Sequence, residues 1–71
     1  MGNPRAQNRI YWVDYTTTGS EKYSPHAIQT ARIVSDGTST RAELKARIVD
    51  RGDALNVESI TIQRVRSELI D

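Results

Sequence analysis

The 71-residue sequence contains no cysteine and only one histidine. It therefore has no disulfide framework and no thiolate ligand, and one imidazole is too few for a zinc site built from protein side chains alone. We expect no cofactor and no metal. A chain of this size forms one domain with a thin margin of stability. Without disulfides or metal, the stabilisers that remain to be expected are helix–sheet packing or self-association.

Long apolar runs and a strong charge of one sign are also missing. No stretch approaches the length of a signal-peptide core or a membrane span, so we expect no membrane partner. The lack of cysteine favours a cytoplasmic protein. Ten Lys/Arg residues against nine Asp/Glu residues leave a formal net charge of +1. Such a balance is not typical of a dedicated DNA-binding protein.

The residues that catalysis requires do not occur in a recognisable set. The four glycines are scattered rather than gathered in a phosphate-binding loop, and no nucleophile comes with a base and an oxyanion site. If a hairpin centred on Ser20, Asp14 would lie opposite His26, which we interpret as a surface cross-strand pair. We therefore predict no catalytic residues, no small-molecule substrate and no enzymatic activity.

The clearest structural signal is a helix over residues 41–51. Thr40 and Glu43 have the spacing of a capping box, the residues between Thr40 and Arg51 are mostly good helix formers, and Gly52 can take the left-handed conformation that ends a helix. The apolar positions form two groups: Ala42, Ala46 and Val49, and Leu44 and Ile48. Either both groups form one core face, or one packs on the sheet and the other meets a partner chain.

Three segments have the composition of strands. Residues 10–18 are almost all β-branched or aromatic, and residues 26–34 and 57–66 follow as the second and third strands. Residues 19–22 predict a hairpin connection between the first two. In the third strand, Ile60 and Ile62 have one parity, and Val57 and Val65 have the other. A bulge would explain this change, and so would an outer face that is only partly polar.

The order strand–strand–helix–strand predicts a single small α+β domain of ββαβ type. We expect a three-stranded antiparallel sheet in the order 2-1-3, because the first strand is the most apolar and therefore the best central strand. The alternative, with the third strand beside the second, would make a parallel pair. A right-handed crossover places the helix on one face only. We divide the chain into a flexible basic arm (1–9), the domain (10–66) and a tail (67–71).

The other face of the sheet then has no cover, and it is the main candidate site. We place Tyr11, Val13 and Tyr15 under the helix, which puts Trp12 on the open face; the rival interpretation has Trp12 in the core. From the third strand we expect Thr61, Gln63 and Val65 on the open face. Tryptophan among aliphatic residues and arginine has the composition of an interaction surface. The predicted protein-binding residues are Ile10, Trp12, Ile28, Arg32, Leu44 and Ile48.

These features favour a non-enzymatic protein-interaction or accessory module. We expect it to form a homodimer through the open sheet face or an edge strand. The alternative is nucleic-acid binding, with Trp12 available for base stacking. Its predicted residues are Arg5, Arg9, Arg32, Arg64 and Arg66. The near-neutral charge, with Asp14 and Glu58 on the same strands, opposes this alternative.

Overall fold

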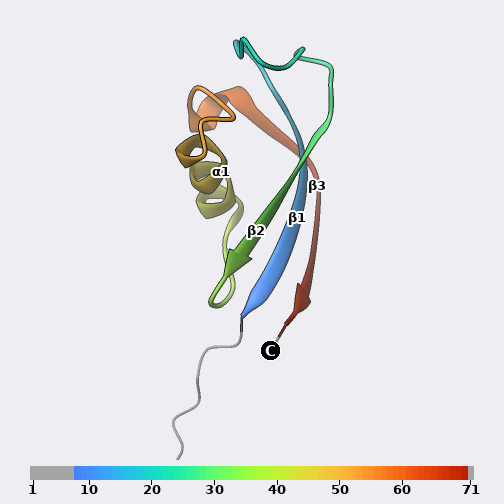
Figure 1. The fold of residues 1–71 in the computed structure, drawn as a ribbon, viewed down its shortest axis with the longest axis vertical. Helices are drawn as coiled ribbons and strands as arrows, with labels where there is room; N and C mark the ends of the chain where they lie inside the picture. The colour runs from blue at the N-terminus through green and yellow to red at the C-terminus, as the bar shows by residue number, and fades with distance from the viewer. Residues whose placement is uncertain (1–7, 71) are drawn as a thin grey trace, which may run out of the picture.

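The computed structural model describes residues 8–70, which fold as the predicted ββαβ arrangement (Figure 1). Its elements are β1 (Arg9–Thr17), β2 (Gln29–Ser35), α1 (Arg41–Asp50), the short 3-10 turn η1 (Val57–Ser59) and β3 (Ile60–Leu69). The three strands form one antiparallel sheet in the order β2-β1-β3. Helix α1 lies against one face of it (Figure 1). The predicted fold class is confirmed.

Both boundary signals of the helix are present in the structure. The Glu43 amide donates to Thr40 Oγ1 at 3.2 Å, and the Thr40 amide donates to Glu43 Oε1 at 2.7 Å. These two bonds satisfy amide donors that the first helical turn leaves without a partner. At the other end Gly52 has a φ of +80°, and its amide donates to the Val49 carbonyl. Local chemistry therefore sets the start and the end of α1.

The core lies between α1 and one face of the sheet. Tyr11, Val13 and Tyr15 of β1 are 5%, 0% and 2% exposed. They form one buried cluster with Ala31 and Ile33 of β2, Leu44 and Ile48 of α1, and Ile60 of β3. The Tyr11 hydroxyl also accepts from the Ser39 amide at 2.8 Å, which ties the loop before α1 to the core. The predicted phase of β1 is confirmed, and Trp12 lies on the opposite face.

A bulge in β3 changes which of its side chains face the helix. Asp14 lies opposite Arg64, whereas Tyr15 lies opposite Ile62, so Gln63 is the extra residue. Beyond this bulge Val65 pairs with Val13 and packs against the core. The bulge is the one proposed from sequence, but the placement of Val65 on the open face is wrong, because the extra residue inverts the parity of the strand.

Strand β3 also begins and ends later than expected. Residues 57–59 form η1, in which the Asn56 side chain accepts from the Ser59 amide at 2.9 Å. The strand continues to Leu69, so residues 67–69 belong to the sheet rather than to a tail. At the other end of the chain, Arg9 is the first residue of β1. The rest of the predicted arm, apart from Asn8, lies outside the described residues.

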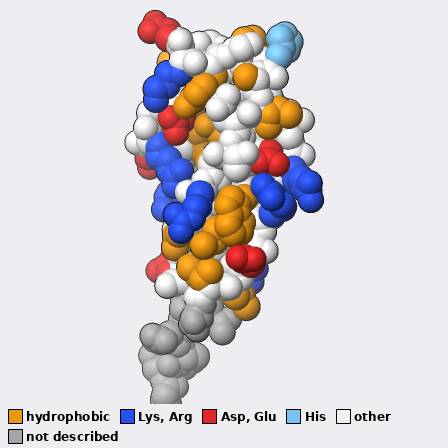
Figure 2. Space-filling view, turned by 45° about the vertical axis from the view of Figure 1, so that its right-hand side comes forward, with side chains coloured by type: hydrophobic (Ala, Val, Ile, Leu, Met, Phe, Trp, Pro, Cys, Tyr) orange, Lys and Arg blue, Asp and Glu red, His pale blue; other side chains and the backbone are white. Residues whose placement is uncertain are grey.

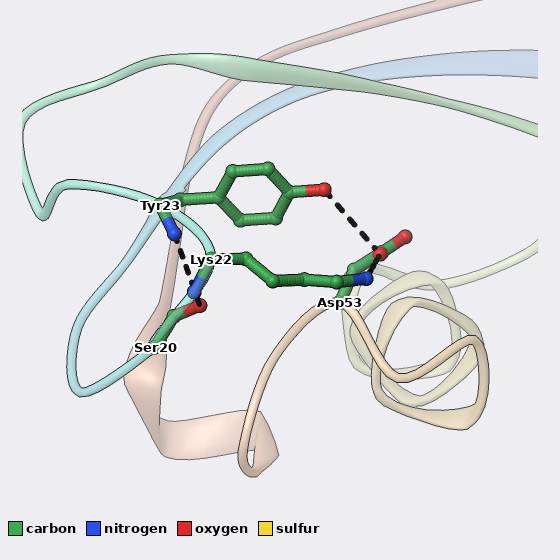
Figure 3. A network of polar contacts seen from close by, with 4 residues as sticks. All are labelled: Ser20, Lys22, Tyr23 and Asp53. Atoms are coloured by element: carbon green, nitrogen blue, oxygen red, sulfur yellow. Dashed lines mark hydrogen bonds and ion pairs between the residues drawn. The ribbon is translucent and has the colours of Figure 1, made fainter.

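The connection between β1 and β2 is longer than the predicted hairpin. It spans residues 18–28 and is held to the segment after α1 by polar contacts (Figure 3). Ser20 Oγ accepts from the amides of Lys22 and Tyr23, and both of these side chains reach Asp53 Oδ1, at 3.2 and 3.5 Å. Such contacts between distant segments leave no local pattern in the sequence.

The longer connection changes the register of the first two strands. Asp14 lies opposite Thr30, and the Thr30 hydroxyl donates to Asp14 Oδ1 at 2.8 Å. The expected pairing of Asp14 with His26 is therefore wrong, because His26 lies in the connection and precedes β2.

Candidate protein-interaction surface

The open face of the sheet is built from the even-numbered residues of β1 and their neighbours. Across the sheet, the register sets three rows that we call the open face. They are Val34–Ile10–Glu68, Arg32–Trp12–Arg66 and Thr30–Asp14–Arg64. Helix α1 lies on the other side, so no helix within residues 8–70 covers these rows (Figure 1).

Trp12 occupies the middle of this face, on the central strand and between two arginines. Directly opposed residues in antiparallel strands have Cβ atoms about 5 Å apart, so the stems of Arg32 and Arg66 flank the indole. Arg66 Nη2 lies 3.6 Å from Asp14 Oδ1. Figure 2 shows apolar side chains on this side of the molecule with basic side chains on both flanks. The arrangement is an aromatic platform between guanidinium groups, with a carboxylate beside it.

The apolar residues of the face differ in how much surface they offer. Ile10 is only 8% exposed, so it forms the floor of the face and adds little contact area. Val34, in the same row, is 40% exposed. Ile28 immediately precedes β2 and is 62% exposed. A partner on this face would therefore meet Ile28, Val34 and the indole edge more than Ile10.

Two residues predicted to bind a partner lie in the core instead. Leu44 and Ile48 are 1% and 0% exposed and pack against β1 and β2. Ala42 and Ala46, the other helix group with Val49, are exposed. Leu44 and Ile48 are therefore not accessible to a partner in the folded domain, because the two largest apolar side chains of the helix pack against the sheet.

The arginines predicted for nucleic acid are only partly brought together. Arg32, Arg64 and Arg66 share the open face. Arg9 has the parity of Tyr11 and faces the other way, where its Nη1 donates to Ser67 Oγ at 3.3 Å. Arg5 lies outside the described residues. Sequence reasoning missed Glu68 as a member of the face, although the alternation of charged and uncharged residues from Arg64 to Glu68 was a signal for a longer strand.

The backbone hydrogen bonds show which groups are free at each edge of the sheet. Thr18 and Asn8 bond to Ser59 and Ile70, so β1 uses its even-numbered residues for β3. Its odd-numbered residues therefore bond to β2, and the even-numbered residues of β2 direct their N–H and C=O groups outward. Two of these outward carbonyls are occupied. Arg47 Nη2 donates to the Val34 carbonyl at 3.2 Å, and Arg51 Nη2 donates to the Arg32 carbonyl.

The edge formed by β3 has no such cover among residues 8–70. By the same alternation, Val65, Ser67 and Leu69 direct their backbone groups away from β1. Side-chain hydrogen bonds of the kind made by Arg47 and Arg51 do not reach these groups within the described part of the chain. Unpaired edge groups of this kind are a template for pairing with another strand.

A concave feature lies away from the open face of the sheet. A hollow of about 450 Å³ separates the start of the β1–β2 connection from the segment after α1, and it is lined by Gly19, Ser20, Glu21, Lys22, Gly52, Ala54 and Leu55. The Lys22 ammonium beside it is paired with Asp53. Across residues 8–70, no three potential metal-ligating side chains come together. None of the helices described there has the length and apolar character needed to cross a membrane.

Comparisons of the chain with protein-family models, with curated proteins and with solved structures found no match.

Proposed function

We propose that the chain is a small non-enzymatic interaction module that binds a second copy of itself through the uncovered part of its sheet. One observation carries this proposal: α1 covers one face of the sheet and, through Arg47 and Arg51, one edge. Among residues 8–70, neither the opposite face nor the opposite edge is covered. The core of a domain of this length supplies little stability, so association with a second copy adds to it.

The composition of the free surface supports protein binding. Tryptophan and arginine dominate the binding energy of many interfaces, and both stand in the middle row of the open face. The face also carries both signs of charge, because Asp14 and Glu68 accompany the arginines. A surface with both signs can be complementary to its own copy, whereas a surface of one sign cannot.

Solution mass over a concentration series tests this function. Sedimentation equilibrium of the full chain, at low and moderate salt, is expected to show a reversible monomer–dimer equilibrium that salt weakens only slightly. The reason is that backbone pairing and apolar contact are not screened as exposed charges are. A monomer at every concentration would refute the proposal.

Nucleic-acid binding is the second candidate, and the row Arg32–Trp12–Arg66 favours it. Bases stack on aromatic side chains while arginines contact the phosphates, and Trp12 is the chain's only tryptophan. Its fluorescence therefore reports directly on the open face. Binding of a single-stranded oligonucleotide should quench this fluorescence. If Arg32, Arg64 and Arg66 each contact a phosphate, the logarithm of the binding constant should fall with the logarithm of the salt concentration with a slope of about −2. Unchanged fluorescence at low salt would exclude this function.

A further inference from the structure

The free edge of β3 identifies where the second copy binds. We propose that two chains join antiparallel through β3, so that their three-stranded sheets become one continuous sheet with Ser67 of each copy at the two-fold axis. This inference rests on the proposed self-association and specifies its surface. Arg47 of α1 and Arg51 just after it occupy two of the outward carbonyls of β2, which leaves β3 as the edge without such cover among residues 8–70.

The side chains of β3 select this register. With Ser67 at the axis, Arg66 lies opposite Glu68 of the second copy, and the pair occurs twice. On the other side of the sheet Val65 lies opposite Leu69, which is 52% exposed in the monomer. Opposite charges and apolar pairs across antiparallel strands are both stabilising. Ser67 also directs its N–H and C=O outward, so the two Ser67 residues can exchange both hydrogen bonds.

The neighbouring registers bring like charges together. An axis at Val65 would set Arg64 opposite Arg66 of the second copy, twice. An axis at Arg66 would bring the two Arg66 side chains together at the centre. Like charges directly opposite each other destabilise a strand pair. The register centred on Ser67 is the one of these three that avoids such a pair.

The joined sheet has two distinct sides. A two-fold axis perpendicular to the sheet keeps both open faces on one side and both α1 helices on the other. The dimer therefore presents two copies of Trp12 on one surface. A pairing of this length buries less than the roughly 1,600 Å² of a standard interface, so we expect a dimer that dissociates on dilution.

A charge exchange between Arg66 and Glu68 tests the register. Arg66→Glu places carboxylates opposite Glu68 of the second copy, and Glu68→Arg places guanidinium groups opposite Arg66. Each variant alone should associate ~10-fold more weakly or worse. An equimolar mixture of the two should recover a 1:1 dimer, because every facing pair then has opposite signs. Arg41→Glu, an exposed charge reversal at the start of α1, is the matched control and should dimerise normally.

The Arg66→Glu variant on its own separates this register from the one centred on Arg66. In that register it would exchange the central pair of guanidinium groups for a central pair of carboxylates and keep both Arg64–Glu68 pairs, so it would associate about as tightly as wild type. Arg66→Glu additionally places a carboxylate beside Asp14, so its fold is checked by circular dichroism. Recovery of the dimer on mixing shows that both variants are folded. Failure to recover, with both variants folded, would overturn the register.

A proline at position 67 tests whether the two copies pair through the β3 edge. Ser67→Pro removes an outward N–H that the monomer does not use, and proline is tolerated at such edge positions. We expect this variant to be folded and monomeric at concentrations where the wild-type chain is dimeric. If Ser67→Pro still dimerises while Trp12→Ala does not, the second copy binds the open face; the β3 inference is then wrong and the proposed function stands. A wild-type chain that is monomeric throughout would remove both.

Discussion

Truncating Ile48 to alanine tests the orientation of α1 on the sheet. The Ile48 side chain is 0% exposed and packs among Val13, Ile33 and Leu44 in the core. Truncating a fully buried isoleucine to alanine costs about 2–5 kcal/mol, from lost burial and the cavity left behind. A 71-residue domain has a total free energy of unfolding of about 4–11 kcal/mol. The variant therefore loses a large part of its stability.

The expected change is large enough to measure by thermal unfolding. For a domain of this length, each kcal/mol lowers the melting temperature by about 4–8 °C, so Ile48→Ala should melt at least about 8 °C below wild type. Ile48→Val, which removes one methylene, should cost about 0.5–1.5 kcal/mol. Leu55→Ala is the control, because Leu55 is 65% exposed and surface truncations usually change stability by about 0.5 kcal/mol or less.

The melts are recorded by circular dichroism at a concentration low enough for the monomer to dominate, because dimerisation itself raises the melting temperature. An Ile48→Ala variant that melts like wild type but associates more weakly would place Ile48 on a partner surface. The helix orientation described above would then be wrong.

Two further predictions concern pH and the covered edge. Burial, with a smaller contribution from Asp53, raises the pKa of Tyr15 above its usual 10.0. The resulting stabilisation is complete below the unfolded pKa of about 10 and is lost as pH rises through the folded pKa. In denaturant unfolding above pH 10, the free energy of unfolding of Tyr15→Phe should therefore fall less with pH than that of wild type. Equal falls in the two proteins would contradict this. The double variant Arg47→Ala/Arg51→Ala frees the β2 edge, at a stability loss of about 1 kcal/mol or less. It should form assemblies larger than dimers in light scattering, whereas Arg41→Ala should not, and a double variant of wild-type mass would show that these arginines do not protect the edge.

The parts of the fold that sequence predicted are those with local causes. The capping box of Thr40 and Glu43 and the left-handed Gly52 set the limits of α1. The apolar composition of β1 indicated the central strand, and the parity change between Ile62 and Val65 indicated the bulge. Each of these signals is contained in a few neighbouring residues, which is why a single sequence was sufficient.

The parts that were missed depend on contacts between distant segments. The β1–β2 register follows from a long connection held by Asp53, so the Asp14–His26 pair could not be judged from spacing. The arginine contacts to the β2 edge depend on how α1 sits across the sheet. The role of Ile48 was ambiguous for the same reason, because two apolar groups on a short helix do not reveal which one meets the sheet.

The candidate face shows the same division. Trp12 was placed on the open side by simple alternation along β1, and the structure agrees. The positions of Arg32 and Arg66 opposite Trp12 depend on the registers of the β1–β2 and β1–β3 pairs, and the β1–β3 pair includes the bulge. The sequence therefore predicted the residue types of the face, whereas their arrangement in rows required the structure.

The position of β1 between its two neighbours has a consequence for how the chain folds. Arg9 pairs with Leu69, so the central strand is completed only when two distant parts of the chain meet. Contacts of such sequence separation slow folding, because a long loop must close before the pairing can stabilise it. Until β3 docks, one side of an apolar, aromatic strand keeps its hydrogen-bonding groups exposed. Chains that end before Ile60, including those still being synthesised, would expose this strand and be prone to aggregate.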